Sequence, residues 1–122
     1  MNKILIVDDD QRNIFALTAT LKQKGFSCIN AMLAEEGLKI LEGENGISAI
    51  MLDMMMPDLD GYEMISLIRK NERLKTIPII AVTARAMPGD RERCIQSGAD
   101  EYIAKPIDVD MMFKLLNNYL KM

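Results

Sequence analysis

The sequence predicts an α/β fold, in which an open, doubly wound parallel sheet of five strands has helices on both faces. Three observations lead to this prediction. Several short apolar runs lack polar–apolar alternation, which is typical of strands buried on both faces. A segment with helical periodicity follows each run, and this strand–helix unit occurs five times with short connections. The 122 residues contain no linker, repeat or low-complexity segment, so residues 1–122 are interpreted as one domain.

The first unit consists of a strand at 3–7 and a helix at 11–24. The strand ends abruptly at three consecutive aspartates, the last of which, Asp10, is a favourable N-cap for the helix. Gly25 is a typical stop signal. The apolar face of this helix consists of Ile14, Leu17 and Leu21.

The second and third units follow the same plan. A short strand at 27–31 precedes a helix at 34–41, and a glycine-containing turn then leads into a continuous apolar strand at 47–52. The helix expected at 61–70 has a regularly spaced apolar stripe, which predicts that one of its faces is buried. This stripe consists of Tyr62, Ile65 and Ile68.

The last two units contain strands at 79–82 and 101–104. The helix between them is expected at 91–97, because Gly98 follows as a stop signal. Asp108 is the expected N-cap of a final amphipathic helix. Its apolar residues are Met111, Met112, Leu115, Leu116, Tyr119 and Leu120.

The composition excludes several classes of protein. Lys and Arg number 15 and Asp and Glu number 18, so the net charge of −3 argues against nucleic-acid binding. The apolar runs are far shorter than the roughly 20 residues of a membrane span. The N-terminal segment reaches acidic residues by Asp8 and is no secretory signal, so a cytoplasmic location is expected. The basic residues interpreted as solvated faces are Arg69, Lys70, Arg73, Lys75, Arg91 and Arg93.

The chain contains no histidine, which excludes His-based catalytic triads, His-ligated zinc and a histidine phosphocarrier role. The two cysteines, Cys28 and Cys94, lack metal-ligand spacing and are interpreted as reduced, buried thiols. Any polar chemistry must therefore come from carboxylates, lysine and hydroxyl groups.

Polar residues follow four of the predicted strands, at the point where each strand ends. They are Asp8 and Asp9, Asp53, Thr83 and Lys105. The carboxyl ends of the strands in an open α/β sheet share one edge, where ligands bind, so we expect these side chains to converge. Each residue taken alone also has a structural interpretation: a helix cap, a turn residue, a strand former or a solvated lysine.

A pocket of this kind is suited to phosphoryl transfer. Three carboxylates at Asp8, Asp9 and Asp53 would repel one another, and Mg²⁺ typically binds such oxygen ligands together with phosphate oxygens. Asp53 could then act as a carboxylate nucleophile toward a phosphoryl group. Lys105 supplies a further positive charge, and the Thr83 hydroxyl can donate a hydrogen bond to a phosphoryl oxygen.

Four segments together resemble response-regulator receiver domains. They are Ile-Leu-Ile-Val-Asp-Asp at 4–9, Met-Leu-Asp-Met-Met-Met-Pro-Asp-Leu-Asp-Gly at 51–61, Ile-Ala-Val-Thr-Ala at 80–84 and Gly-Ala-Asp-Glu-Tyr-Ile-Ala-Lys-Pro at 98–106. They occur in the family's order and spacing over essentially the whole chain. The resemblance implies a flavodoxin-like strand order of 2-1-3-4-5.

The resemblance also implies a two-component or phosphorelay function. Asp53 would accept a phosphoryl group from a histidine of a sensor histidine kinase or a histidine phosphotransfer protein. Asp8, Asp9 and Asp53, with the backbone carbonyl of Met55, would bind Mg²⁺, for which Mn²⁺ could substitute. The residues expected to contact the phosphoryl group are Thr83, Ala84 and Lys105.

Further residues of the pattern imply a conformational switch. Thr83 would move toward the phosphoryl group and the ring of Tyr102 would swing inward, which changes the surface of the fourth and fifth units. A cis peptide bond between Lys105 and Pro106 would aim the lysine into the pocket. This surface would control a downstream protein or a fused output domain, and a phosphorylation-dependent homodimer is a further expectation.

Two positions correspond to those at which the family varies the lifetime of the phosphoryl group, namely Met55 and Arg85. An apolar Met55 side chain cannot orient an attacking water by a hydrogen bond. Slow self-dephosphorylation is therefore predicted.

Two other functions remain as alternatives to a signalling phospho-acceptor with no separate turnover substrate. A phosphorylation-independent docking module would use the same fold without the chemistry. A haloacid-dehalogenase-like phosphatase would use an Asp-x-Asp motif, which Asp8 and Asp10 provide, but the chain is short and has no cap insertion. The start at Met1 favours a stand-alone receiver or one at the N-terminus of a regulator, although excision from a hybrid kinase stays open.

Overall fold

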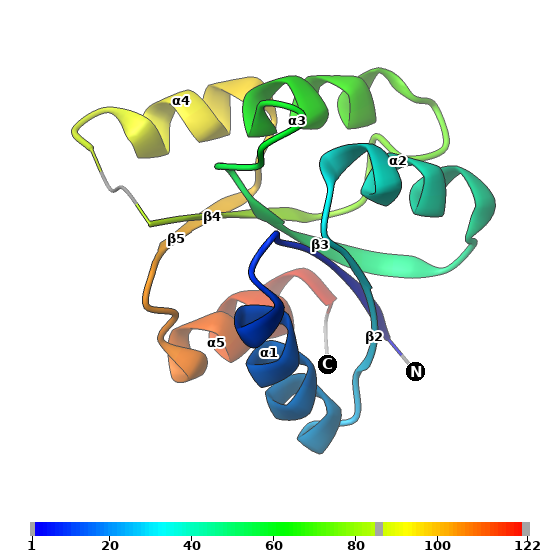
Figure 1. The fold of residues 1–122 in the computed structure, drawn as a ribbon, viewed down its shortest axis with the longest axis vertical. Coiled ribbons are helices and arrows are strands. Elements are labelled where there is room, and N and C mark those ends of the chain that lie inside the picture. Colours follow the sequence, from blue (N-terminus) through cyan, green and yellow to red (C-terminus); the bar gives the residue numbers. More distant parts are fainter. Residues whose placement is uncertain (1, 85–86, 121–122) are drawn as a thin grey trace.

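The computed structural model describes residues 2–84 and 87–120. Its five strands form one sheet in the order β2-β1-β3-β4-β5, and all neighbouring strands are parallel, as predicted (Figure 1). The strands are β1 (Lys3–Val7), β2 (Ser27–Ala31), β3 (Ile47–Asp53), β4 (Ile79–Thr83) and β5 (Glu101–Ala104).

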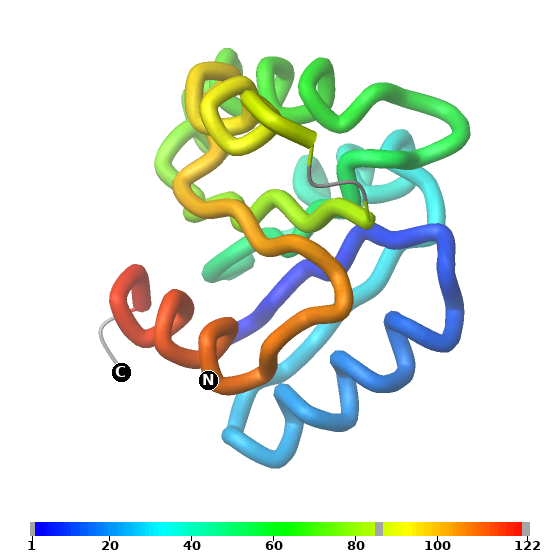
Figure 2. Tube along the Cα trace, turned by 90° about the vertical axis from the view of Figure 1, so that its left-hand side faces the viewer, coloured from blue at the N-terminus to red at the C-terminus, as the bar shows by residue number. Residues whose placement is uncertain are grey.

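Helices cover both faces of this sheet. They are α1 (Gln11–Gln23), α2 (Ala34–Gly43), α3 (Gly61–Lys70), α4 (Asp90–Ser97) and α5 (Val109–Leu120). Helices α1 and α5 lie on one face, and α2, α3 and α4 lie on the other (Figures 1 and 2). The doubly wound arrangement expected from the sequence is therefore confirmed. Among the described residues, no helix combines the length and the apolar character needed to cross a membrane.

Two hydrophobic cores explain why the strand sequences do not alternate. Side chains point to opposite faces at successive positions of a strand. In β1, Ile4 and Ile6 pack in the core beneath α1 and α5, whereas Leu5 and Val7 pack in the core beneath the other three helices. All four side chains are at most 1% exposed, because both faces of the sheet are covered.

Strands β3 and β4 each extend one residue beyond the predicted boundary. Asp53 pairs with Val82, and Thr83 pairs with Ala104. The ladder continues because the backbone N–H of Met54 donates to the Val82 carbonyl at 2.9 Å. Asp53 and Thr83 therefore belong to the sheet itself, and their backbones are held by its hydrogen bonds.

Two interpretations of single residues are wrong. Arg69 is not part of a solvated face, since its guanidinium donates to the carbonyls of Gly98 and Ile77, both at 2.8 Å, and forms an ion pair with Asp100. It thereby joins α3 to the loop before β4 and to the start of β5. Cys28, on the edge strand β2, is only partly buried, whereas Cys94 is buried as expected.

Candidate functional site

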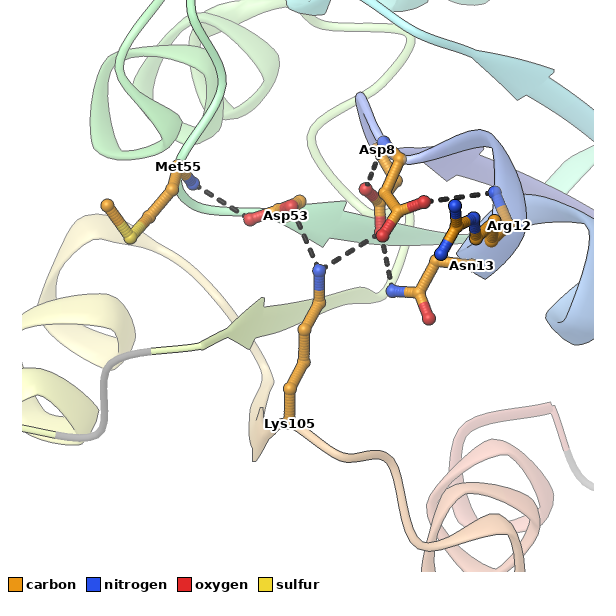
Figure 3. Close-up of polar contacts among 7 residues, drawn as sticks. Asp8, Arg12, Asn13, Asp53, Met55 and Lys105 are labelled. Carbon is orange, nitrogen blue, oxygen red and sulfur yellow. Dashed lines mark hydrogen bonds and ion pairs between the residues drawn. The ribbon is translucent and has the colours of Figure 1, made fainter.

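Three carboxylates gather at the carboxyl ends of β1 and β3, and Figure 3 shows two of them, Asp8 and Asp53. Carboxylate oxygens of Asp8, Asp9 and Asp53 all lie within 4.8 Å of one another. Asp8 is 3% exposed and Asp53 is 6% exposed, while Asp9 is open to solvent. Two of the three charges are thus withdrawn from water, which is costly unless they are compensated.

Lys105, in the connection after β5, provides part of that compensation. Its ammonium nitrogen lies 3.1 Å from Asp53 Oδ2 and 3.2 Å from Asp8 Oδ2, between the two carboxylates (Figure 3). Burial acts to lower the pKa of Lys105, but the hydrogen bond and charge of Asp53 and the charge of Asp8 outweigh it and raise that pKa. The peptide bond between Lys105 and Pro106 is cis.

Hydrogen bonds fix the orientation of the Asp8 carboxylate. The backbone N–H of Asp10 donates to Oδ1 at 2.8 Å, and the side-chain amide of Asn13 donates to Oδ2 at 2.9 Å. Asn13 lies in the first turn of α1, so the start of this helix positions a site residue. The sequence interpretation missed this role, although Asp10, the confirmed N-cap, predicts that the first turn of α1 lies beside Asp8.

The Asp53 carboxylate is held from its own loop. The backbone N–H of Met55 donates to Asp53 Oδ1 at 2.9 Å, and the Met55 side chain points away from the carboxylates (Figure 3). Burial raises the pKa of Asp53 above its ordinary value, and the hydrogen bonds from Met55 and Lys105 oppose that shift. The ionised form is therefore disfavoured by its surroundings.

The charges of the cluster match a divalent cation. Three carboxylates and one ammonium group leave two negative charges uncompensated within the cluster. Mg²⁺ prefers oxygen ligands of this kind and tolerates a partly open site in which water and phosphate complete its coordination. The residues present thus fit the group that the sequence resemblance implies.

Three of the remaining predicted site residues, Thr83, Ala84 and Tyr102, lie on β4, directly after it and on β5. Thr83 is 4% exposed at the end of β4, and Ala84 after it is exposed. Tyr102, on β5, is partly buried, and its hydroxyl is enclosed without a hydrogen-bond partner among the residues that the structure describes. Burial, with a smaller contribution from Asp90, raises the pKa of Tyr102. Arg85 lies outside the described residues.

The family model of the response regulator receiver domain matches residues 4–117. The chain belongs to this family. Receiver domains are signalling phospho-acceptors, and the fold and the acidic edge of the sheet are those of the family.

Relatives of this receiver domain come from several bacteria. The polar-differentiation response regulator DivK of Brucella ovis is 33% identical over 117 residues, covering 96% of this chain and 94% of DivK. The sensor histidine kinase CheAY of Helicobacter pylori is 34% identical over 120 residues, which is 98% of this chain but 15% of that longer protein.

A solved structure bears on the metal. The receiver domain of the sensor histidine kinase PA1611 from Pseudomonas aeruginosa PAO1 is 32% identical and superimposes with a TM-score of 0.89, covering 99% of this chain and 98% of that one. That crystal structure has a magnesium ion coordinated in its active site cleft. In this chain, the cluster of Asp8, Asp9 and Asp53 is present at the edge of the sheet.

Proposed function

We propose that this receiver domain, spanning residues 1–122, accepts a phosphoryl group on Asp53 from a phosphohistidine of a sensor kinase or phosphotransfer protein. One observation carries the proposal. The Asp53 carboxylate is nearly buried, yet it shares its surroundings with the carboxylates of Asp8 and Asp9 and with the ammonium group of Lys105. A purely structural aspartate would not require two further acids at the same edge of the sheet.

The proposed reaction is a transfer between two nucleophiles. The P–N bond of the phosphohistidine breaks, its electron pair returns to the imidazole nitrogen, which takes up a proton, and a carboxylate oxygen of Asp53 forms the new P–O bond. Asp8, Asp9, Asp53 and the Met55 carbonyl would hold Mg²⁺, which supplies positive charge opposite the phosphoryl oxygens.

The chain's own residues orient the acceptor and balance the transferred charge. The Met55 N–H holds Asp53 in one orientation, which favours an in-line approach. Lys105 exchanges part of its contact with Asp53 for the incoming phosphoryl oxygens. The Thr83 hydroxyl donates to the same group, and the small Ala84 leaves room for it.

Phosphorylation then changes the surface that a partner recognises. The group adds a charge of about −1.5 to −2 at this edge of the sheet. Thr83 moves toward it, Tyr102 follows inward, and the surface formed by α4, β5 and α5 changes. A downstream protein or a fused output domain, or a second copy of the chain, would recognise the altered surface in the cytoplasm. Met55 and Arg85 tune how long the phosphoryl group remains.

Intact mass spectrometry after incubation with acetyl phosphate tests the proposal. A Mg²⁺-dependent gain of one phosphoryl group is expected for the wild type and none for Asp53→Asn. Asp110→Asn, which removes an exposed carboxylate at the start of α5, is the matched control and should behave as the wild type does.

The docking-module alternative predicts a different outcome of the same experiment. It requires that no adduct form under any condition and that a beryllofluoride titration, which needs no labile bond, also detect no binding at Asp53. The phosphatase alternative lacks support, since the family match is to receiver domains.

A further inference from the structure

Asp58 lies outside the acidic cluster but makes two hydrogen bonds to a different unit of the fold. Its Oδ1 accepts from the backbone N–H of Ala34 and its Oδ2 accepts from that of Glu35, both at 3.1 Å. These are the first two residues of α2. Leu33 occupies the N-cap position of this helix and has no side-chain acceptor, so Asp58, 24 residues from Ala34 in the sequence, supplies the cap instead.

The end of β2, which precedes α2, is also bonded to the loop after β1. The backbone N–H of Asp8 donates to the carbonyl of Ala31 at 3.0 Å. Residues 31–35 are therefore joined to the loop after β1 through Asp8 and to the loop after β3 through Asp58. The second unit contributes no side chain to the acidic cluster, yet the end of β2 and the start of α2 are hydrogen-bonded to both loops that do.

The two hydrogen bonds of Asp58 hold the middle of the loop after β3. Its beginning is held by the sheet, because Met54 donates to Val82, and its end is held by Asp60, which caps α3 by accepting from Tyr62 at 2.8 Å. Asp58 lies between these anchors, three positions after Met55. The hydrogen bonds from Glu35 and Ala34 lower the pKa of Asp58, so the carboxylate that makes them stays ionised at neutral pH.

We infer that Asp58 is a positioning residue for the cation site and for phosphoryl transfer to Asp53. Its two bonds to α2 hold the loop in the conformation in which the Met55 N–H donates to Asp53. This inference rests on the proposed function. Without these two bonds, the middle of the loop can move and Met55 adopts several orientations. The side chains of the site itself, Asp8, Asp9, Asp53 and Lys105, are all still present.

The test compares Asp58→Ala with a variant that weakens the other end of the same helix. Arg73 donates to the carbonyls of Leu41 and Glu42, at 3.1 and 3.0 Å, near the C-terminus of α2. Arg73→Ala therefore removes two hydrogen bonds from α2 without touching the loop after β3. Mg²⁺ affinity is measured by calorimetry, and the Mg²⁺ concentration for half-maximal adduct formation is measured with acetyl phosphate.

For Asp58→Ala, we expect Mg²⁺ affinity to fall by about tenfold, with a matching rise in the half-maximal Mg²⁺ concentration. Asp58→Asn, which keeps one acceptor oxygen, should recover part of the loss, and Arg73→Ala should stay within about twofold of the wild type. Wild-type affinity in Asp58→Ala, or an equal loss in Arg73→Ala, would overturn the inference. A wild type that binds Mg²⁺ but forms no adduct would defeat the proposed function alone, because calorimetry still reports on Asp58.

Discussion

The ammonium group of Lys105 lies 3.1 Å from the carboxylate of Asp53, although 52 residues separate them in the sequence. The same nitrogen is 3.2 Å from Asp8, so one cation joins the ends of three strands. In the metal-free protein, Lys105 balances part of the negative charge of the carboxylates, which a bound divalent cation would also balance. Stability and cation binding are therefore linked at this position.

Lys105→Met should destabilise the metal-free protein. Removal of the ammonium group leaves the buried carboxylates of Asp8 and Asp53 facing each other, so the free energy of unfolding should fall by about 2–4 kcal/mol. Saturating Mg²⁺ should recover much of this loss. Urea unfolding with EDTA and with Mg²⁺ measures both effects. Lys75→Met, which breaks an exposed pair with Glu72, should cost less than about 1 kcal/mol, and an equal loss in the two variants would contradict this prediction.

The pH dependence of stability should reveal the burial of Asp53. Its pKa is raised above the ordinary 3.8 chiefly by burial, so the folded protein binds this proton more tightly than the unfolded chain. Stability from this group therefore declines as the pH rises through the raised pKa. Without divalent cations, Asp53→Asn should be more stable than the wild type at pH 7, and the difference should shrink as the pH falls toward 3.8. A less stable Asp53→Asn at pH 7, measured by urea unfolding, would refute this assignment.

Gly61→Ala should disturb the loop after β3. A Cβ atom at this position would come within 2.8 Å of both the Cα and the sulfur of Met54, and the backbone atom cannot move aside easily. We expect a loss of about 1–3 kcal/mol in the free energy of unfolding, together with weaker Mg²⁺ binding. Gly43→Ala is the control, since nothing lies within 4 Å of its added Cβ. Equal thermal stability of the two variants would contradict the close contact at Gly61.

Arg69→Ala should be less stable than the wild type but should still accept a phosphoryl group. The side chain donates to three loop carbonyls and pairs with Asp100 at 2.8 Å, and Asp100 also accepts from the Ile79 N–H. We expect a loss of about 3 kcal/mol, since several charge-assisted hydrogen bonds disappear together. Adduct formation by the folded protein should persist. Lys70→Ala, at an exposed position, should change the free energy of unfolding by less than about 0.5 kcal/mol. A loss in Lys70→Ala as large as that in Arg69→Ala would contradict the stabilising role of the Arg69 hydrogen bonds.

Thr83→Ala should separate phosphorylation from its readout. The hydroxyl is proposed as the contact that differs between the two states, so the variant should still form the adduct on Asp53. Backbone NMR shifts of α4, β5 and α5 on beryllofluoride binding should, however, shrink markedly. Thr83→Ser, which retains the hydroxyl, serves as the control. Full shift changes in Thr83→Ala would remove Thr83 from the proposed switch.

The fold could be predicted from the sequence because its main signal is local. The strand around Ile4 and Leu5 reads as a continuous apolar run, since each face of the sheet buries alternate residues. The cluster could be predicted for a related reason. In a parallel sheet, Asp8 and Asp53 must share an edge once each is recognised as standing at a strand's carboxyl end.

The contacts that the sequence does not predict are made by side chains that lie far apart in the sequence. Arg69 meets Asp100 across 31 positions of sequence, and nothing in the local pattern around Arg69 distinguishes it from the exposed Lys70. Asp58 caps α2 from the next unit, so the sequence around Leu33 gives no sign of the cap. The sequence pattern predicts the ends of β3 and β4 one residue early because a polar Asp53 or Thr83 resembles the start of a turn, whereas the ladder hydrogen bonds continue.

Chemical mapping of the adduct tests the central claim most directly. The protein is incubated with acetyl phosphate and Mg²⁺ and reduced with borohydride, which converts an aspartyl-phosphate into homoserine, and tryptic peptides are then sequenced by mass spectrometry. The account predicts homoserine at position 53 and at no other aspartate, with none when EDTA replaces Mg²⁺. Homoserine at Asp8, Asp9 or Asp58, or its absence from every peptide of a protein that gained a phosphoryl group, would contradict the assignment of Asp53 as the acceptor.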